Sequence, residues 1–220
     1  MAKGISRERI VQAALDLLDE KGIDGVTARA LAHRLDVRAP ALYWHMSNKQ
    51  EILNEMGTEI ARRVAARLDA LPANLDWRDR LAGYARALRQ EYLAHRDGAR
   101  TFSGAKLTDP AVLHAQEAHL RAWIDTGLTL PNAVAAAQTV RAFVVGFVLE
   151  EQERNRTDRY LLADQDEHVG TDVPLVREAG HQLFGDPEEM FERNLDLVLT
   201  GIGVRFVGDA AEPGPVRSAR

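Results

Sequence analysis

The sequence predicts an all-α protein, with an N-terminal three-helix, helix-turn-helix head followed by a larger helical domain. Three observations support this fold class. Apolar residues recur at helical spacing in every strongly patterned segment. No segment alternates apolar and polar residues between hairpin turn signals, as a half-buried strand would. Residues 27–49 have the pattern of two short helices joined by a tight turn. Because the second helix of such a motif lies in the DNA major groove, we expect the head to bind DNA.

The three head helices have recognisable ends. The first is expected from Ser6, a favourable N-cap residue, to Lys21, and Gly22 ends it because glycine tolerates the left-handed conformation. Thr27 caps the first helix of the helix-turn-helix motif, and the second helix begins near Arg38. Each helix has its apolar residues on one face, so the three can share one small core.

A long fourth helix is expected next, because residues 47–50 form a Ser-x-x-Gln capping box and apolar residues then recur on one face. This helix links the head to the body. Later helices are expected at about residues 77–95, near Phe102, after Asp109-Pro110, at about 129–155 and 175–183, and after Asp186-Pro187. Residues 156–172 have the composition of a loop. The predicted organisation is a head at 1–48, a helical body at 49–207 and a disordered tail at 208–220.

Composition narrows the function. The chain has 220 residues and no cysteine, which excludes disulfides, thiolate zinc sites and cysteine nucleophiles and suits a cytoplasmic protein. The start lacks the apolar core of a signal peptide, and the most apolar run, residues 142–149, is too short to span a bilayer, so no membrane partner is expected. The net charge of −5 hides a basic head, since residues 1–50 hold eight lysines and arginines against six acidic residues. Such a protein is expected to contact DNA with one end only.

Two helices of the body, at about residues 130–155 and 187–205, are apolar around more than one face. A helix of this kind cannot expose all its faces to water. It is either buried inside one subunit or paired with its two-fold mate in a four-helix interface. We expect a homodimer, because helix-turn-helix proteins normally bind palindromic sites in pairs.

Several segments resemble a known family. Residues 25–49, and the run Leu42-Tyr43-Trp44-His45 within them, resemble the DNA-binding head of the TetR family of bacterial repressors, and its tetracycline repressors in particular. Residues 95–99 and 149–153 resemble stretches in the ligand-binding body of those repressors. The resemblance covers about residues 6–206. It implies a homodimeric repressor that binds double-stranded operator DNA, with a ligand-binding and dimerisation domain through which a small-molecule effector releases that DNA.

The resemblance also assigns the base contacts. Arg29 matches the family's base-reading arginine, whose guanidinium suits guanine O6 and N7; a phosphate contact is the alternative. Ala39 and Ala41 stand where tetracycline repressors have a glutamine and a threonine. Alanine contacts a thymine methyl but donates no hydrogen bond, so a different operator is expected, with Arg38 providing polar readout.

Tyr43 and Lys49 match the family's phosphate contacts, and His45 can assist them. Trp44 is expected to pack in the core of the head and to have no DNA role. The full predicted DNA-binding set is Thr27, Arg29, Arg38, Ala39, Pro40, Ala41, Tyr43, His45 and Lys49.

The predicted effector site departs from the family. Phe102 stands where tetracycline repressors have a metal-binding histidine, so no metal or other cofactor is expected and tetracycline is excluded as the effector. Glu150, which matches the family's water-mediated magnesium partner, and His119 remain as polar groups. The predicted lining is Tyr84, Leu88, Phe102, His119, Trp123, Phe143, Phe147 and Glu150. This lining suits a small apolar or aromatic effector with one or two hydrogen-bonding groups. The alternative is that these side chains simply fill the core.

An enzyme is the alternative from another class, because His114, Glu117 and His119 lie close in the sequence. Two metal-binding histidines on one helix require a spacing of four, whereas these are five apart and point to different faces. No enzymatic activity is therefore expected. A DNA-binding regulator without an effector is the remaining alternative.

Overall fold

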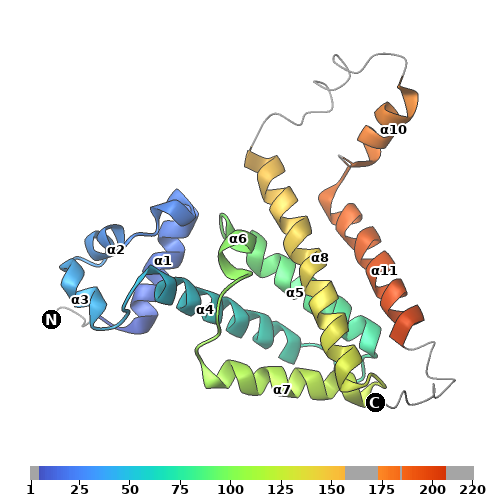
Figure 1. Cartoon of the computed structure of the whole chain (residues 1–220), viewed down its shortest axis with the longest axis horizontal. Coiled ribbons are helices and arrows are strands. Elements are labelled where there is room, and N and C mark those ends of the chain that lie inside the picture. The colour runs from blue at the N-terminus through green and yellow to red at the C-terminus, as the bar shows by residue number, and fades with distance from the viewer. Residues whose placement is uncertain (1–4, 157–172, 184, 207–220) are drawn as a thin grey trace, which may run out of the picture.

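The computed structural model describes residues 5–156, 173–183 and 185–206, and every regular element within these ranges is a helix (Figure 1). The all-α prediction is confirmed for this part of the chain. The elements are α1 Arg7–Lys21, the 3₁₀ helix η1 Ile23–Gly25, α2 Ala28–Arg34, α3 Ala39–Tyr43, α4 Lys49–Asp69, α5 Trp77–Leu93, α6 Gly98–Phe102, α7 Pro110–Asp125, α8 Leu130–Arg156, α10 Pro174–Leu183 and α11 Pro187–Phe206. The loop expected at 157–172 and the tail expected at 208–220 lie outside the described residues.

Local sequence signals set most of the helix ends. The Ser6 hydroxyl accepts a hydrogen bond from Arg9 N, and the Thr27 hydroxyl accepts one from Ala30 N, so both predicted N-caps are confirmed. Gly22 follows α1 with a φ of 71°, the left-handed region that favours glycine. Asp109 caps α7 in the same way, accepting from the backbone N–H of Ala111.

The capping box predicted for α4 is wrong by one residue. Asn48 is the N-cap, and its side chain accepts from Glu51 N at 2.9 Å, whereas Ser47 supplies no capping oxygen. The Glu51 carboxylate reaches back to accept from Ser47 N at 2.6 Å. Serine and asparagine are both common at the N-cap position. Here the backbone of Asn48 is extended and directly precedes the first helical residue, so Asn48 is the cap.

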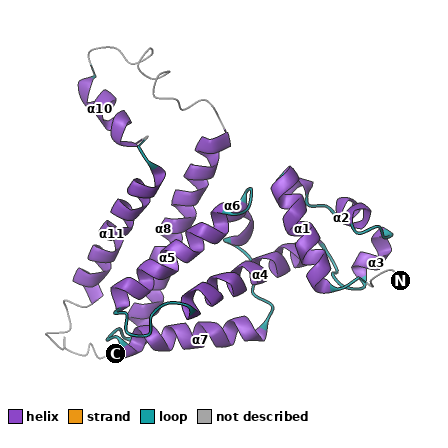
Figure 2. Ribbon diagram, turned by 180° about the vertical axis from the view of Figure 1, so that it is seen from behind, coloured by secondary structure: helices purple, strands orange, loops and turns teal. Residues whose placement is uncertain are grey.

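Helix α4 runs from the head into the body (Figure 1, Figure 2). It packs against α1 in the head and against α5, α6 and α7 in the body. Arg7 of α1 forms ion pairs with Glu51 and Glu55, both in the first half of α4. Arg67 near its end forms an ion pair with the buried Glu91 of α5. One helix therefore belongs to both cores.

In the body, α8 packs between α5 and α11 around a buried ionic cluster. Arg89 of α5 donates to both carboxylate oxygens of Glu151, at 3.0 and 3.1 Å, and also bonds to Glu188. Its guanidinium lies 4.6 Å from the ring centroid of Phe191 on α11. Arg89 and Glu151 are both buried, so this pair joins α5 to α8 away from solvent, and the more exposed Glu188 links Arg89 to α11.

Helix α8 is also long and apolar enough, by length and composition, to cross a membrane over Leu130–Arg154, with a mean hydropathy of 1.5. The core helix of a soluble protein meets the same criteria. Its contacts with α5 and α11 assign it to a helical core here. Only 33% of the most apolar 18-residue segment within this stretch is buried, however, so much of its apolar surface has no partner in the subunit.

We predict that Glu151→Gln destabilises the protein by about 3 kcal/mol, the lower end of the range for breaking a buried ion pair, because Glu188 still contacts Arg89. The matched control is Glu192→Gln on α11, which breaks the more exposed pair with Arg86 and should cost less than about 1 kcal/mol. Urea unfolding followed by circular dichroism at one protein concentration measures both values. Equal losses in the two variants would contradict the assignment of the cluster to the core.

Candidate DNA-binding surface and effector cavity

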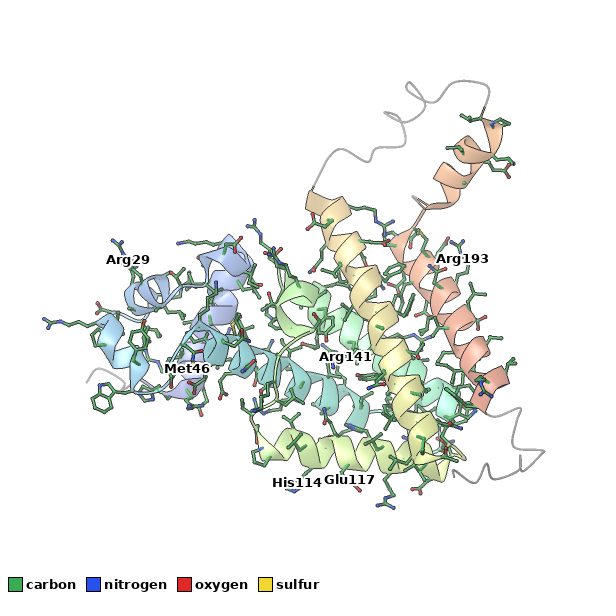
Figure 3. All side chains as sticks on the ribbon, viewed as in Figure 1. Arg29, Met46, His114, Glu117, Arg141 and Arg193 are labelled. Atoms are coloured by element: carbon green, nitrogen blue, oxygen red, sulfur yellow. The ribbon has the colours of Figure 1, made fainter. Side chains whose placement is uncertain are left out.

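The predicted DNA-binding residues lie on α2, on α3, at the N-caps of these two helices, just after α3 and at the start of α4. Six of them are exposed and three are half-buried, while Leu42 between them is buried and fixes α3 to the head. Arg29 extends from α2 at the outer end of the molecule (Figure 3). Among the described residues, neither Arg29 nor Arg38 has an ion-pair partner, so both guanidinium groups face solvent uncompensated. The exposed residues of the set are Thr27, Arg29, Arg38, Pro40, Tyr43 and Lys49, and the half-buried ones are Ala39, Ala41 and His45.

Two of these side chains also have structural roles. The Thr27 hydroxyl is used in capping α2. The Lys49 ammonium donates to Ile23 O at 3.0 Å, which ties the start of α4 to η1. An ammonium has three N–H donors, so Lys49 keeps two for a phosphate.

The expectation that Trp44 packs in the head core is wrong. Its side chain is 89% exposed, and that of Tyr43 is 54% exposed. Helix α3 ends at Tyr43 with Trp44 as its C-cap, and the buried positions on either side belong to Leu42 and Met46. Two aromatic side chains therefore stand on the surface next to the predicted base-reading residues.

Polar contacts join the head to the body where α1 meets the turn after α5. The His95 imidazole contacts the Asp19 carboxylate at 3.0 Å, and Arg96 N donates to the same group at 3.3 Å. Asp97, which has a left-handed φ of 56°, accepts from Ile23 N at 3.0 Å. These bonds connect α1 and η1 of the head with residues 95–97 of the body, and they therefore fix the orientation of the head relative to the body. We call this group the head–body junction.

The junction reaches the interior of the body through an aromatic contact. The rings of His95 and Phe102 pack edge to face with centroids 5.7 Å apart. Phe102 belongs to α6 and lines a cavity in the body. A change in that cavity can therefore reach Asp19 of α1 through two side chains.

We predict that Asp19→Ala lowers the free energy of unfolding by about 1–3 kcal/mol, because His95 and Arg96 N lose their shared acceptor. Asp16→Ala is the matched control on the same helix. Asp16 is half-buried, but its contacts stay within the head: it accepts from the Gln12 amide at 2.8 Å and reaches Arg34 at 3.5 Å, so its loss should change stability by less than about 0.5 kcal/mol. Thermal unfolding would show the difference as a shift of about 2–12 °C for Asp19→Ala alone. Identical melting curves for the two variants would rule out a stabilising junction.

The body holds a cavity of about 120 Å³ among α4, α5, α6, α7 and α8. Four of the eight predicted effector-site residues line it. Helix α4 contributes more of the wall than any other element. The lining residues are Gly57, Ile60, Ala61, Val64, Ala65, Leu68, Tyr84, Leu88, Tyr92, Phe102, Ala105, Leu107, Val112, Gln116, His119 and Arg141.

The other four predicted site residues lie outside this cavity. Trp123 is buried and packs edge to face on Tyr84, with ring centroids 5.7 Å apart. Phe143 and Phe147 both pack on Phe191 and join α8 to α11. The contacts of these three aromatics are with other side chains of the core, as the alternative reading expects. Glu150 is exposed on α8.

The buried acid on α8 is the next residue, Glu151, which forms the ion pair with Arg89. A shift of one residue turns a side chain by roughly 100° around a helix, so the two neighbouring acids face different surroundings. Glu150 and Glu151 are identical neighbours in the sequence, and nothing local to them indicates which one is buried.

Sequence reasoning missed Arg141, Gln116 and Tyr92 as lining residues. For Arg141 a signal existed, because it is the one charged residue within the apolar segment 140–149 of α8. For Gln116 the signal was its position three residues before His119, which places the two on neighbouring turns of α7.

Most of the polar groups around the cavity are neutral. Burial raises the pKa of the Tyr84 hydroxyl to about 12, so it remains a neutral phenol at pH 7. Burial also raises the pKa of Tyr92, opposed by the charge of Arg141 and by a hydrogen bond from it. The His119 imidazole contacts the exposed Asp69 carboxylate at 3.1 Å.

Within the described part of the chain no three histidine, cysteine or acidic residues converge as metal ligands. His114 and Glu117 lie on the outer side of α7 (Figure 3), while His119 contacts Asp69. The three residues considered for catalysis therefore do not converge on one site.

An exposed helix-turn-helix surface joined by one helix to an internal cavity defines a DNA-binding regulator with a ligand-binding body. Comparison with known proteins agrees. Residues 10–56 match the family described as "Bacterial regulatory proteins, tetR family", and residues 71–206 match "Tetracyclin repressor-like, C-terminal domain". The chain belongs to the TetR family, and it is a transcriptional repressor with a ligand-binding C-terminal domain.

Curated relatives include the class A tetracycline repressor from transposon 1721 of Escherichia coli, 38% identical over 204 residues and 89% of each chain. The class G repressor of Vibrio anguillarum is 38% identical over 208 residues, covering 90% of this chain and 93% of that one. A possible TetR family regulator from Streptomyces coelicolor A3(2) superposes with a TM-score of 0.78 at 36% identity, covering 90% and 98% of the two chains. The structure of a class A tetracycline repressor bound to 5a,6-anhydrotetracycline and magnesium superposes with a TM-score of 0.65 at 34% identity, covering 89% of this chain and 96% of that one.

Proposed function

We propose that this repressor acts as a cytoplasmic homodimer on a palindromic operator and is released by a small apolar or aromatic effector other than tetracycline. The observation that supports this most is the dual role of α4. Its first half packs on α1 in the head, and its second half forms much of the cavity wall. Occupation of the cavity and the position of the head are thereby linked.

For DNA recognition, we assign guanine readout to Arg29 and further polar readout to Arg38, both exposed cations on the head surface. Ala39 and Ala41 would contact thymine methyl groups. Tyr43 and Lys49 would hold phosphates and fix the register of the head on the duplex. Trp44 adds an exposed aromatic surface to this set.

The dimer is supported by the outward faces of α8 and α11, two helices that lie side by side (Figure 1, Figure 2). On α11, Leu197 is 67% exposed and Val204 is 72% exposed. On α8, Val134, Ala142 and Gly146 are exposed and share one face. Two such pairs can form a four-helix interface and cover apolar surface that the single chain leaves in water.

The size of the cavity supports a mechanical switch. Ligand pockets usually enclose about 300–1,000 Å³, whereas this one encloses about 120 Å³. An effector larger than a single ring must therefore move the walls apart. Because α4 forms so much of the wall, its second half would shift and carry the head with it, which would change the separation of the two recognition helices.

Tetracycline fits this cavity poorly. A relative binds anhydrotetracycline together with magnesium. Here Phe102 lines the cavity, and no acidic residue is found among the described lining residues. Carboxylates and other oxygen ligands are what Mg²⁺ requires, so we propose an effector that binds without a metal.

The test is selection of DNA sequences by the purified protein, followed by mobility-shift titration at fixed salt with sedimentation analysis. We expect a palindromic site bound by a dimer. Arg29→Ala should weaken binding by about 5- to 150-fold and relax preference at one guanine in each half-site, because one bidentate contact contributes about 1–3 kcal/mol.

The matched control is Arg121→Ala on the exposed side of α7, which should bind like the wild type. Failure of the wild-type protein to select any sequence, even at low salt, would refute the proposed function. Selection of a site by the protein with an unchanged preference in Arg29→Ala would refute only the role given to Arg29.

A further inference from the structure

The charges around the effector cavity are unbalanced. Among its described lining residues Arg141 is a permanent cation, and no aspartate or glutamate is present. The other ionisable base, His119, already contacts the Asp69 carboxylate. A guanidinium keeps its proton at any physiological pH. The cavity therefore has a positive charge that no residue in its described wall neutralises.

Arg141 stands at the edge of the cavity, where α8 passes the end of α6 (Figure 3). One of its terminal N–H groups donates to Ser103 O, the carbonyl at the C-cap of α6. It forms no salt bridge with any described residue. A guanidinium has five N–H donors in a planar fork, so several remain for another acceptor after Ser103 O and the Tyr92 hydroxyl are bound.

The neighbours of Arg141 do not supply the missing negative charge. The pKa of Tyr84 is about 12, so its hydroxyl is neutral at pH 7, and burial raises the pKa of Tyr92 as well. Both residues line the cavity together with Leu88 and Phe102. These four side chains form an aromatic and aliphatic wall beside one cation. Such a wall suits a flat, apolar ligand body with a charged end.

Support of the α6 C-terminus explains the position of Arg141 but not its charge. A neutral amide or hydroxyl donor could also bond to Ser103 O, and the bond to this carbonyl leaves the positive charge of Arg141 without an anionic partner. Arg141 is also exposed enough to remain hydrated when the cavity is empty. An anion that replaced this water would make two parallel charge-assisted hydrogen bonds, which are among the strongest polar contacts in proteins.

We propose that the effector of this repressor is an aromatic carboxylate, or an equivalent anion, whose negative group pairs with Arg141 while its ring system lies among Tyr84, Leu88 and Phe102. This inference rests on the proposed function and specifies the class of effector. A neutral molecule of the same shape leaves the guanidinium without its partner, and the site therefore discriminates against it. The anion requirement separates this site from one that holds a metal chelate.

The test is isothermal titration of the full-length protein with acid and amide pairs of equal shape: benzoate and benzamide, 2-naphthoate and 2-naphthamide, and anthracene-2-carboxylate and its amide. At pH 7.5 and fixed salt, at least one carboxylate should bind about tenfold or more tightly than its amide, because charge-assisted bonds exceed neutral ones by that order. In Arg141→Gln the ratio of the two affinities should fall to about one. Arg141→Lys keeps the charge and loses the fork, so it should retain part of the preference.

Arg121→Gln is the matched control, because it removes one arginine from the exposed side of α7 and should keep the full carboxylate preference. Circular dichroism melting establishes that each variant is folded. The proposal is overturned if no pair in the panel shows a carboxylate preference in the wild type, whether the amides bind equally or nothing binds. It is also overturned if Arg141→Gln keeps the preference.

Operator binding without any probe distinguishes this inference from the proposed function. A protein that binds its operator but shows no carboxylate preference remains a repressor with a different effector class. If the protein prefers carboxylates through Arg141 but binds no operator, the anion site at Arg141 is supported and the proposed function as a repressor is refuted.

Discussion

Helix α4 must fit two cores at once, and most of the structure depends on that constraint. At its start, Glu51 and Glu55 hold Arg7 of the head. Between these two acids, the Asn54 side chain accepts from Lys106 N at 3.1 Å, in the segment between α6 and α7 of the body. The second half then forms a wall of the cavity. A rigid helix held at both ends converts a small displacement at one end into a rotation at the other, and this property lets a ligand in the body affect the head.

Much of the fold was predictable because helix ends depend on local chemistry. Ser6, Thr27 and Asp109 each cap the helix that the sequence assigned to them. The N-cap of α4 and the burial of Trp44 were both predicted wrongly, and for the same reason. Two good caps stand next to each other before α4, and Trp44 stands between the buried Leu42 and Met46, two residues from each. In both cases the outcome depends on a one-residue register set by packing, which the sequence pattern alone does not fix.

Only part of the lining of the cavity was predictable from the sequence. Aromatic residues on helices were correctly recognised as interior, but their neighbours decide whether they face a cavity or another helix. Phe147 faces Phe191 and Arg89, whereas Phe102 faces the cavity. The family resemblance directed attention to Glu150, while the ionic pairing on α8 belongs to Glu151. Arg141 was visible as a break in an apolar run, but its relation to the cavity depends on how α8 crosses α6.

The most direct test of the link between α4 and DNA binding needs no effector. A Cβ built on Gly57 of α4 would clash with the Cβ of Ala105, whose short side chain cannot move aside. Gly57→Ala should therefore push α4 from its wall position, as a ligand would, and lower operator affinity by about 5- to 150-fold, the usual range of coupling between sites. The double variant Gly57→Ala, Ala105→Gly removes the clash and should restore affinity. A folded Gly57→Ala protein that binds the operator like the wild type would contradict the account.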